Sequence, residues 1–102
     1  MIVGIMNVFE VMDKTKRKIR LTQNRWRHIT IKHPYMTNYL AEVEDTIINS
    51  QNIIAHEYGD LSDYYKYFKH RKDDLKLLKV VVKYLNGDGF VLSAYFVKNI
   101  AY

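Results

Sequence analysis

Apolar residues recur at alternate positions through the last third of the chain. The runs 64–70, 75–85 and 90–97 predict strands, because a strand points successive side chains to opposite faces. The turn Asn86-Gly87-Asp88-Gly89 predicts a hairpin between the last two runs, with a three-residue loop at 86–88. In that register one face pairs only apolar residues: Tyr84 with Phe90, Val82 with Leu92, Val80 with Ala94, and Leu78 with Phe96. We expect this face to be buried together with Trp26, Val43 and Ile47.

The first half of the chain has the spacing of helices. Thr22 is a good N-cap residue, and the Trp26 and Ile29 that follow it lie on one helical stripe. Arg25, His28 and Lys32 share another stripe, and Pro34 ends the helix. A second helix is expected over about 38–49 and a short strand over 52–58, while 2–12 and 18–21 predict strands. The pattern therefore predicts one α+β domain over residues 1–102. Two helices of the N-terminal half pack on one face of an antiparallel β-sheet.

Length and composition exclude several classes of protein. A chain of 102 residues with 48% hydrophobic and 26% charged residues is typical of one globular domain. Its apolar runs are shorter than the roughly 20 residues of a membrane span. The stretch 1–11 lacks the basic start and small-residue cleavage site of a signal peptide. There is no cysteine and no glycine-rich phosphate loop. We expect a cytoplasmic protein with no membrane contact and no cofactor.

The histidines do not have the spacing of a metal site. His28 and His33 are five positions apart, which turns them about 140° from each other on a helix. His56 and His70 have no acidic residue at ligand spacing. We therefore expect no metal.

The net charge of +5 is strongly segregated along the chain. Residues 14–33 contain eight basic residues and no acid, 34–65 contain six acids and no Lys or Arg, and 66–83 contain seven basic residues. We expect the two basic blocks to converge on one surface, apart from Glu42, Glu44 and Asp45, and to attract a phosphate polymer. Nine tyrosines, several beside lysines, add surfaces on which nucleobases stack. The competing explanation is that tyrosine is a good strand former.

One motif resembles a known nuclease family. The resemblance is carried by the run Leu21-Thr22-x-x-Arg25-Trp26-x-His28-Ile29-x-x-x-His33-Pro34-x-Met36, and by Tyr64-Tyr65-Lys66 and Ser93-Ala94-Tyr95-Phe96 further on. Over about residues 17–97 the chain resembles the phage-associated branch of the barnase–EndoU–colicin–RelE superfamily, the BECR fold. This resemblance implies a metal-independent RNase fold whose helices cover one sheet face and whose active surface is the other.

Carried over residue by residue, the resemblance implies a set of catalytic candidates: His28, His33, Lys66, Ser93 and Tyr95. Basic residues expected to contact nucleic acid accompany them: Arg25, Lys32, Lys69, Lys79 and Lys83. The competing interpretation of His33 is a packing or capping role, and that of His28 and Lys66 is plain solvation. Tyr35 stands where we expect Glu in relatives, which weakens the case for a strong general base.

The function implied is a metal-independent endoribonuclease, in which the RNA 2′-hydroxyl is the nucleophile and the protein moves protons. Such an enzyme could be the toxin of a toxin–antitoxin or mobile-element system. Its partners would be RNA and an acidic antitoxin or immunity protein. Two alternatives stay open: a non-catalytic RNA- or DNA-binding module, and a protein-interaction domain.

Overall fold

Six strands form one mixed sheet in the computed structural model, which describes residues 6–101, and its order is β1-β2-β6-β5-β4-β3. The strands are β1 (Asn7–Met12), β2 (Lys18–Thr22), β3 (Asn52–Ala55), β4 (Leu61–Tyr67), β5 (Leu77–Leu85) and β6 (Asp88–Val97). The expected α+β fold is confirmed, but the sheet is not wholly antiparallel, because β2 runs parallel to β6. The part of the first predicted strand before residue 6 lies outside the described residues.

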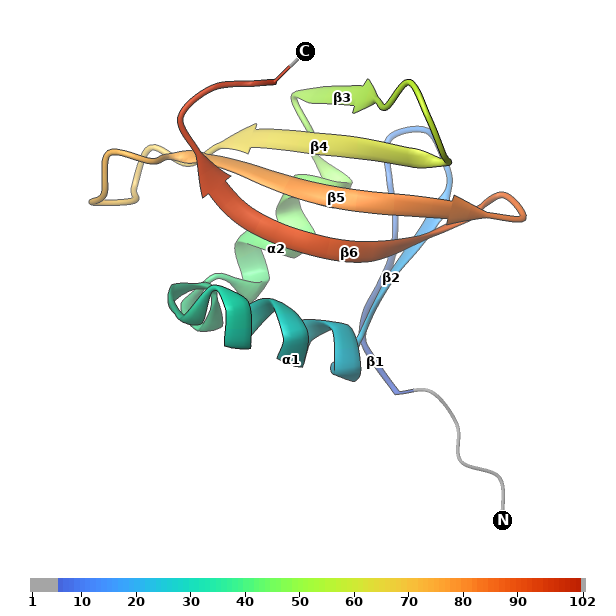
Figure 1. The fold of residues 1–102 in the computed structure, drawn as a ribbon, viewed down its shortest axis with the longest axis horizontal. Helices are drawn as coiled ribbons and strands as arrows, with labels where there is room; N and C mark the ends of the chain where they lie inside the picture. Colours follow the sequence, from blue (N-terminus) through green and yellow to red (C-terminus); the bar gives the residue numbers. More distant parts are fainter. Residues whose placement is uncertain (1–5, 102) are drawn as a thin grey trace.

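The helical elements lie on one side of the sheet, with α1 running beside β6 (Figure 1). They are α1 (Gln23–Lys32), the short 3-10 helix η1 (Pro34–Asn38) and α2 (Leu40–Ile48). Thr22 caps α1 as expected, since its hydroxyl accepts a hydrogen bond from the Arg25 backbone N–H at 3.1 Å. Among residues 6–101, no helix is long and apolar enough to cross a membrane.

The β5–β6 hairpin differs from the predicted register in its outer half. Asn86 and Gly87 form a two-residue loop with φ of 55° and 87°, the left-handed conformation that an Asn-Gly turn favours. An irregularity between Val81 and Val82 then shifts the register back into phase. The pairs Leu78–Phe96 and Val80–Ala94 are confirmed, whereas Val82 pairs with Val91 and Tyr84 with Gly89.

The core lies between this hairpin and the helices. Leu78, Val80, Val82, Ala94, Phe96, Val43 and Ile47 are buried as expected. Val91 takes the buried place predicted for Leu92, because the irregularity moves Leu92 out of the apolar face. Trp26 was also expected to be buried, but it is only partly buried and packs against the edge of the core.

Asp13 joins the N-terminal hairpin to the rest of the sheet. Its buried carboxylate accepts hydrogen bonds from the Thr15 and Arg17 backbone, the Thr15 hydroxyl and the Tyr64 hydroxyl. Tyr64 in turn lies 2.6 Å from the Tyr84 hydroxyl oxygen. Burial of Asp13 opposes its charge, but these donors outweigh that cost and lower the pKa of the carboxyl.

Gly89 allows β2 to approach β6 closely. A Cβ atom at this position would lie 2.5 Å from Ile19 Cδ1 and 2.9 Å from Val82 Cγ1. The parallel pairing is short, since only Ile19 with Gly89 and Arg20 with Phe90 are partners. Beyond Phe90, the edge of β6 that faces away from β5 has no pairing with β2, and α1 runs beside it (Figure 1).

We predict that Gly89→Ala destabilises the fold by roughly 1–3 kcal/mol, because the added methyl overpacks this contact. Thermal denaturation should show a fall in Tm on the order of 10 °C. Ile19→Val removes the atom that the new methyl meets first, so Gly89→Ala should cost less in that background. An equal cost in both backgrounds would show that the clash with Ile19 is not the cause.

Candidate functional site

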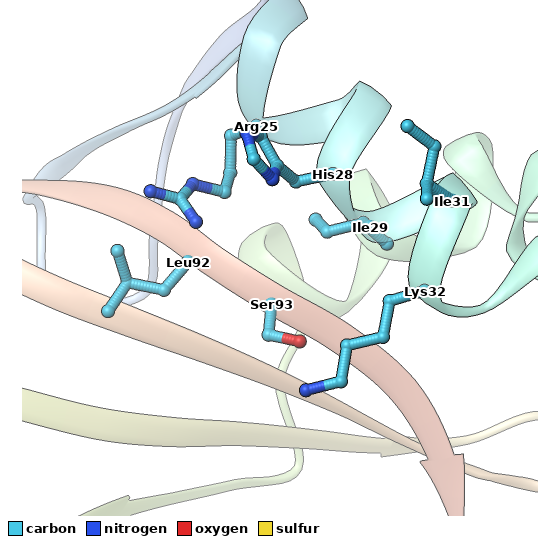
Figure 2. A pocket seen from close by; sticks show the side chains of 7 residues that line it. All are labelled: Arg25, His28, Ile29, Ile31, Lys32, Leu92 and Ser93. Atoms are coloured by element: carbon cyan, nitrogen blue, oxygen red, sulfur yellow. The ribbon is translucent and has the colours of Figure 1, made fainter.

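A basic groove lies between α1 and the part of β6 that β2 does not cover. Its volume is about 280 Å³, and Figure 2 shows the side chains that line it: Arg25, His28, Ile29, Ile31, Lys32, Leu92 and Ser93. In this view Arg25 and Lys32 reach from α1 toward β6, and the Ser93 hydroxyl points to the Lys32 end. No acidic residue is among those seven.

Two local features of the sequence place these side chains together. Arg25, His28 and Lys32 are spaced i, i+3 and i+7, so they share one face of α1. On β6, the irregularity after Val91 brings both Leu92 and Ser93 to the groove, although neighbouring residues of a regular strand point to opposite faces. The spacing of the sequence predicts the helical stripe, and the family resemblance names Ser93 as a candidate, but neither predicts the irregularity.

His33 and Tyr95 continue the site beyond the groove. Tyr95 is two residues after Ser93, which corresponds to about 7 Å along a strand. The His33 ring stacks on the Tyr95 ring, with 5.1 Å between their centres and 27° between their planes. Burial, and to a lesser degree the charge of Lys32, lower the pKa of His33 below its ordinary value. His33 is therefore neutral at neutral pH and able to accept a proton.

Lys79 lies beside Tyr95 on the open face of the sheet, the face that the helices do not cover. Its Nζ lies 5.5 Å from the centre of the Tyr95 ring and 3.5 Å from Asp63 Oδ2. Burial disfavours the charged form, but the Tyr95 hydroxyl and the Asp63 carboxylate outweigh it and raise the pKa of Lys79. Asp63 is 4% exposed and lies 2.8 Å from His56 Nε2.

A second cavity of about 420 Å³ adjoins Lys79 and Asp63 on the open face. It is lined by Ile54, Ala55, His56, Glu57, Asp63, Lys79 and Ala101. The chain after β6 crosses toward β4 here, where the Ala101 N–H donates to the Tyr65 hydroxyl at 3.4 Å. Tyr65 is completely buried, and this burial raises the pKa of its hydroxyl.

Lys66 does not join the other catalytic candidates. It pairs with Leu78 in the sheet, so its side chain is on the helix side, opposite Tyr95. There its ammonium forms an ion pair with Asp45 of α2 and lies 5.0 Å from the centre of the Phe68 ring. Lys66 therefore cannot act together with the candidate Ser93, because strand alternation puts the two side chains on opposite faces of the sheet. Burial of Asp45 opposes its charge, but the bonds from Lys66 and Asn49 outweigh it and lower the pKa.

The two basic blocks do not form one cationic surface as expected. Lys66 pairs with Asp45 of α2, and His70 pairs with Glu42 of the same helix. The acidic helix is therefore not separated from the second basic block. Lys69 is exposed just after β4 and Lys83 is exposed on β5, and neither lines the groove. Of the expected nucleic-acid contacts, Arg25 and Lys32 meet in the groove and Lys79 lies on the open face.

Sequence reasoning missed the Asp63–His56 pair. The available signal was an acid in the middle of a strand, since a buried carboxylate needs a partner. Its partners come from β5 and from the segment after β3, and sequence spacing does not show which strands are neighbours. Within residues 6–101, no three His, Cys, Asp or Glu side chains gather closely enough to hold a metal ion.

Comparison with protein-family models, curated proteins and solved structures gives no match to this chain. The activity has to be inferred from the groove, from the charges around it and from the sequence pattern.

We predict that part of the stability is lost as pH falls from about 7 to 5, because His33 has a lowered pKa in the folded state. The unfolded chain binds the proton more readily, so stability is fully present above about pH 6.5 and falls as the pH passes the folded-state pKa. Tm measured across this range should fall less for His33→Gln. Ile31→Gln, an exposed change on the same helix, should keep the wild-type slope. The same slope in His33→Gln would contradict this assignment.

Proposed function

We propose that this protein is a metal-independent endoribonuclease whose scissile phosphate lies in the α1–β6 groove. The observation that carries the proposal is the meeting of Arg25, His28 and Lys32 of α1 with Ser93 of β6 around one open cavity. A phosphate needs cations, and RNA cleavage needs proton-transfer groups beside them. The resemblance of the sequence to the BECR nucleases supports the same activity.

The groove is suited to an anion. Arg25 offers a planar fork of N–H donors and Lys32 a mobile point charge, the two forms in which proteins commonly bind phosphate. Because no carboxylate lines the groove, the non-bridging oxygens of a phosphate meet no repulsion there. The Ser93 hydroxyl can donate a further hydrogen bond to one of these oxygens.

The proposed reaction moves two protons and needs no external nucleophile. His33 takes the proton of the 2′-hydroxyl, and the oxygen attacks phosphorus. The bond from phosphorus to the 5′-oxygen breaks, and His28 protonates this leaving oxygen. The products are a 2′,3′-cyclic phosphate and a 5′-hydroxyl. Arg25 and Lys32 balance the negative charge that grows on the phosphate oxygens.

Tyr95 and Lys79 take supporting roles in this proposal. Tyr95 stacks on the base His33 and fixes the plane of its ring. Lys79, which its neighbours Tyr95 and Asp63 keep charged despite burial, adds positive potential on the open face where the RNA strand leaves the groove. Exposed cations such as Lys69 and Lys83 contribute to attraction at longer range.

The resemblance also supports a cytoplasmic toxin whose action an acidic antitoxin or immunity protein blocks. A groove lined by Arg25 and Lys32 with no acid offers the charge complementarity that such a partner would use. An acidic partner that covers the groove would exclude RNA directly.

We predict that the purified protein cleaves single-stranded RNA in excess EDTA and leaves a cyclic phosphate end. His28→Ala and His33→Ala should each lower the rate by about 10²–10⁴-fold, since each removes a proton-transfer group. His70→Ala is the matched control, because this histidine is exposed and pairs with Glu42 away from the groove. A substrate with 2′-deoxyribose at the cleavage site should not be cut.

Binding measurements separate the alternatives. Arg25→Ala and Lys32→Ala should weaken RNA retention, and each should reduce the salt slope by about one. Salt-dependent binding without cleavage would replace the enzyme by a non-catalytic nucleic-acid module. Absence of both would leave a protein-interaction domain.

A further inference from the structure

Arg71 is a buried cation in the loop between β4 and β5. It is 7% exposed, and its guanidinium carbon lies 4.0, 4.9 and 5.3 Å from the ring centres of Phe96, Tyr35 and Tyr39 respectively. Its Nη1 donates to the Leu75 carbonyl and its Nε to the Tyr39 hydroxyl at 3.4 Å. Burying a guanidinium is costly, and here hydrogen bonds and three aromatic faces offset that cost.

Tyr35 connects this cation to the outer edge of β6. Its hydroxyl accepts a hydrogen bond from the Phe96 backbone N–H at 3.1 Å. β2 pairs with β6 only up to Phe90, so this edge N–H has no strand partner in β2. Tyr35 therefore ties η1 to the sheet at the residue that follows Tyr95.

His33 lies between two tyrosines that β6 anchors. Its ring centre is 5.1 Å from that of Tyr95. It is 6.1 Å from the ring centre of Tyr35, and the planes of His33 and Tyr35 are tilted by 60° to each other. His33 also ends α1, where its N–H donates to the Ile29 carbonyl at 2.7 Å. The position of the imidazole thus depends on how η1 is held against β6.

We propose that Arg71 and Tyr35 form a clamp that positions His33 against Tyr95, so that the β4–β5 loop sets the geometry of the base. This inference rests on the proposed function for its catalytic meaning. It also gives Tyr35 a role at the position where the family resemblance leads us to expect Glu: here the residue holds the histidine in place rather than acting as a base. Arg71 and Tyr35 are positioning residues, since they act through His33.

Loosening the clamp should change how His33 titrates. The charged and titratable groups facing its ring are Lys32 of α1, Tyr35 of η1 and Tyr95 of β6, and Arg71 reaches it only through Tyr35. Burial is the main cause of the lowered pKa of His33. A clamp that opens admits water to the ring, so the pKa should rise toward its ordinary value.

The test follows the His33 ring by NMR between about pH 5 and 8, where histidine titrates, in the full chain and in Tyr35→Phe, Arg71→Lys and Arg71→Met. Tyr35→Phe removes only the hydroxyl that binds β6. We expect an upward shift of the His33 titration in each variant. On the acid limb we expect kcat for RNA cleavage to fall about two- to fivefold with KM nearly unchanged.

Two controls address a merely structural role. Tyr58→Phe changes a tyrosine that is 81% exposed, and Lys72→Met changes an exposed cation next to Arg71, so both should titrate as the wild type. If Arg71→Met does not fold, Arg71→Lys and Tyr35→Phe decide the question. A fall in Tm with an unchanged His33 titration and kcat–pH profile would overturn the clamp. If wild type fails to cleave RNA but the titration shifts, the clamp stands and the proposed function falls.

Discussion

The short parallel contact between β2 and β6 is the constraint on which the site depends. Gly89 has no Cβ, so Ile19 can pack directly over the start of β6, and the pairing of β2 with β6 then ends after two residues, shortly before β2 itself ends at Thr22. Thr22 turns the chain into α1 at that point, and α1 follows the edge of β6 that a longer β2 would have covered. The groove exists because a strand gives way to a helix there. Its cations come from the helix, and its hydroxyl comes from the strand.

The charged side chains on the two faces of the sheet have different surroundings. On the helix side, Asp13 is buried with four donors, and Lys66 is neutralised by Asp45, so charge there serves structure. On the open face, Lys79 and Asp63 are also paired, but they adjoin an open cavity and the Tyr95–His33 stack. A buried ion pair is costly to maintain and contributes little net stability. On this face the pair is retained beside a cavity that is open to solvent.

Local sequence signals predicted the parts of the structure that neighbouring residues determine. Thr22 as a cap and the stripe of Arg25, His28 and Lys32 depend on spacings of a few residues. The pairs Leu78–Phe96 and Val80–Ala94 agree with the predicted register because the shorter loop and the irregularity compensate for each other. The errors concern pairings set by the whole fold. Leu92 was misplaced because an Asn-Gly loop shortens the turn and an irregularity corrects the phase, so only the combined register shows where it lies. Lys66 was misjudged because its partner Asp45 comes from α2, and Asp63 was missed because its partner His56 comes from the segment after β3.

The groups around Tyr95 are held in opposite protonation states. On one side, burial and Lys32 keep His33 neutral, while on the other, Tyr95 and Asp63 keep Lys79 charged despite burial. Groups whose environments push their pKa values apart can divide acid–base and electrostatic work between them at one pH. The separation here comes from different neighbours rather than from different residue types alone. Asp63 belongs to β4 and Lys32 to α1, so the division exists only once the sheet and helix have assembled. It is therefore present in the folded protein before any ligand binds, which is the condition under which fixed charges and dipoles lower a reaction barrier most.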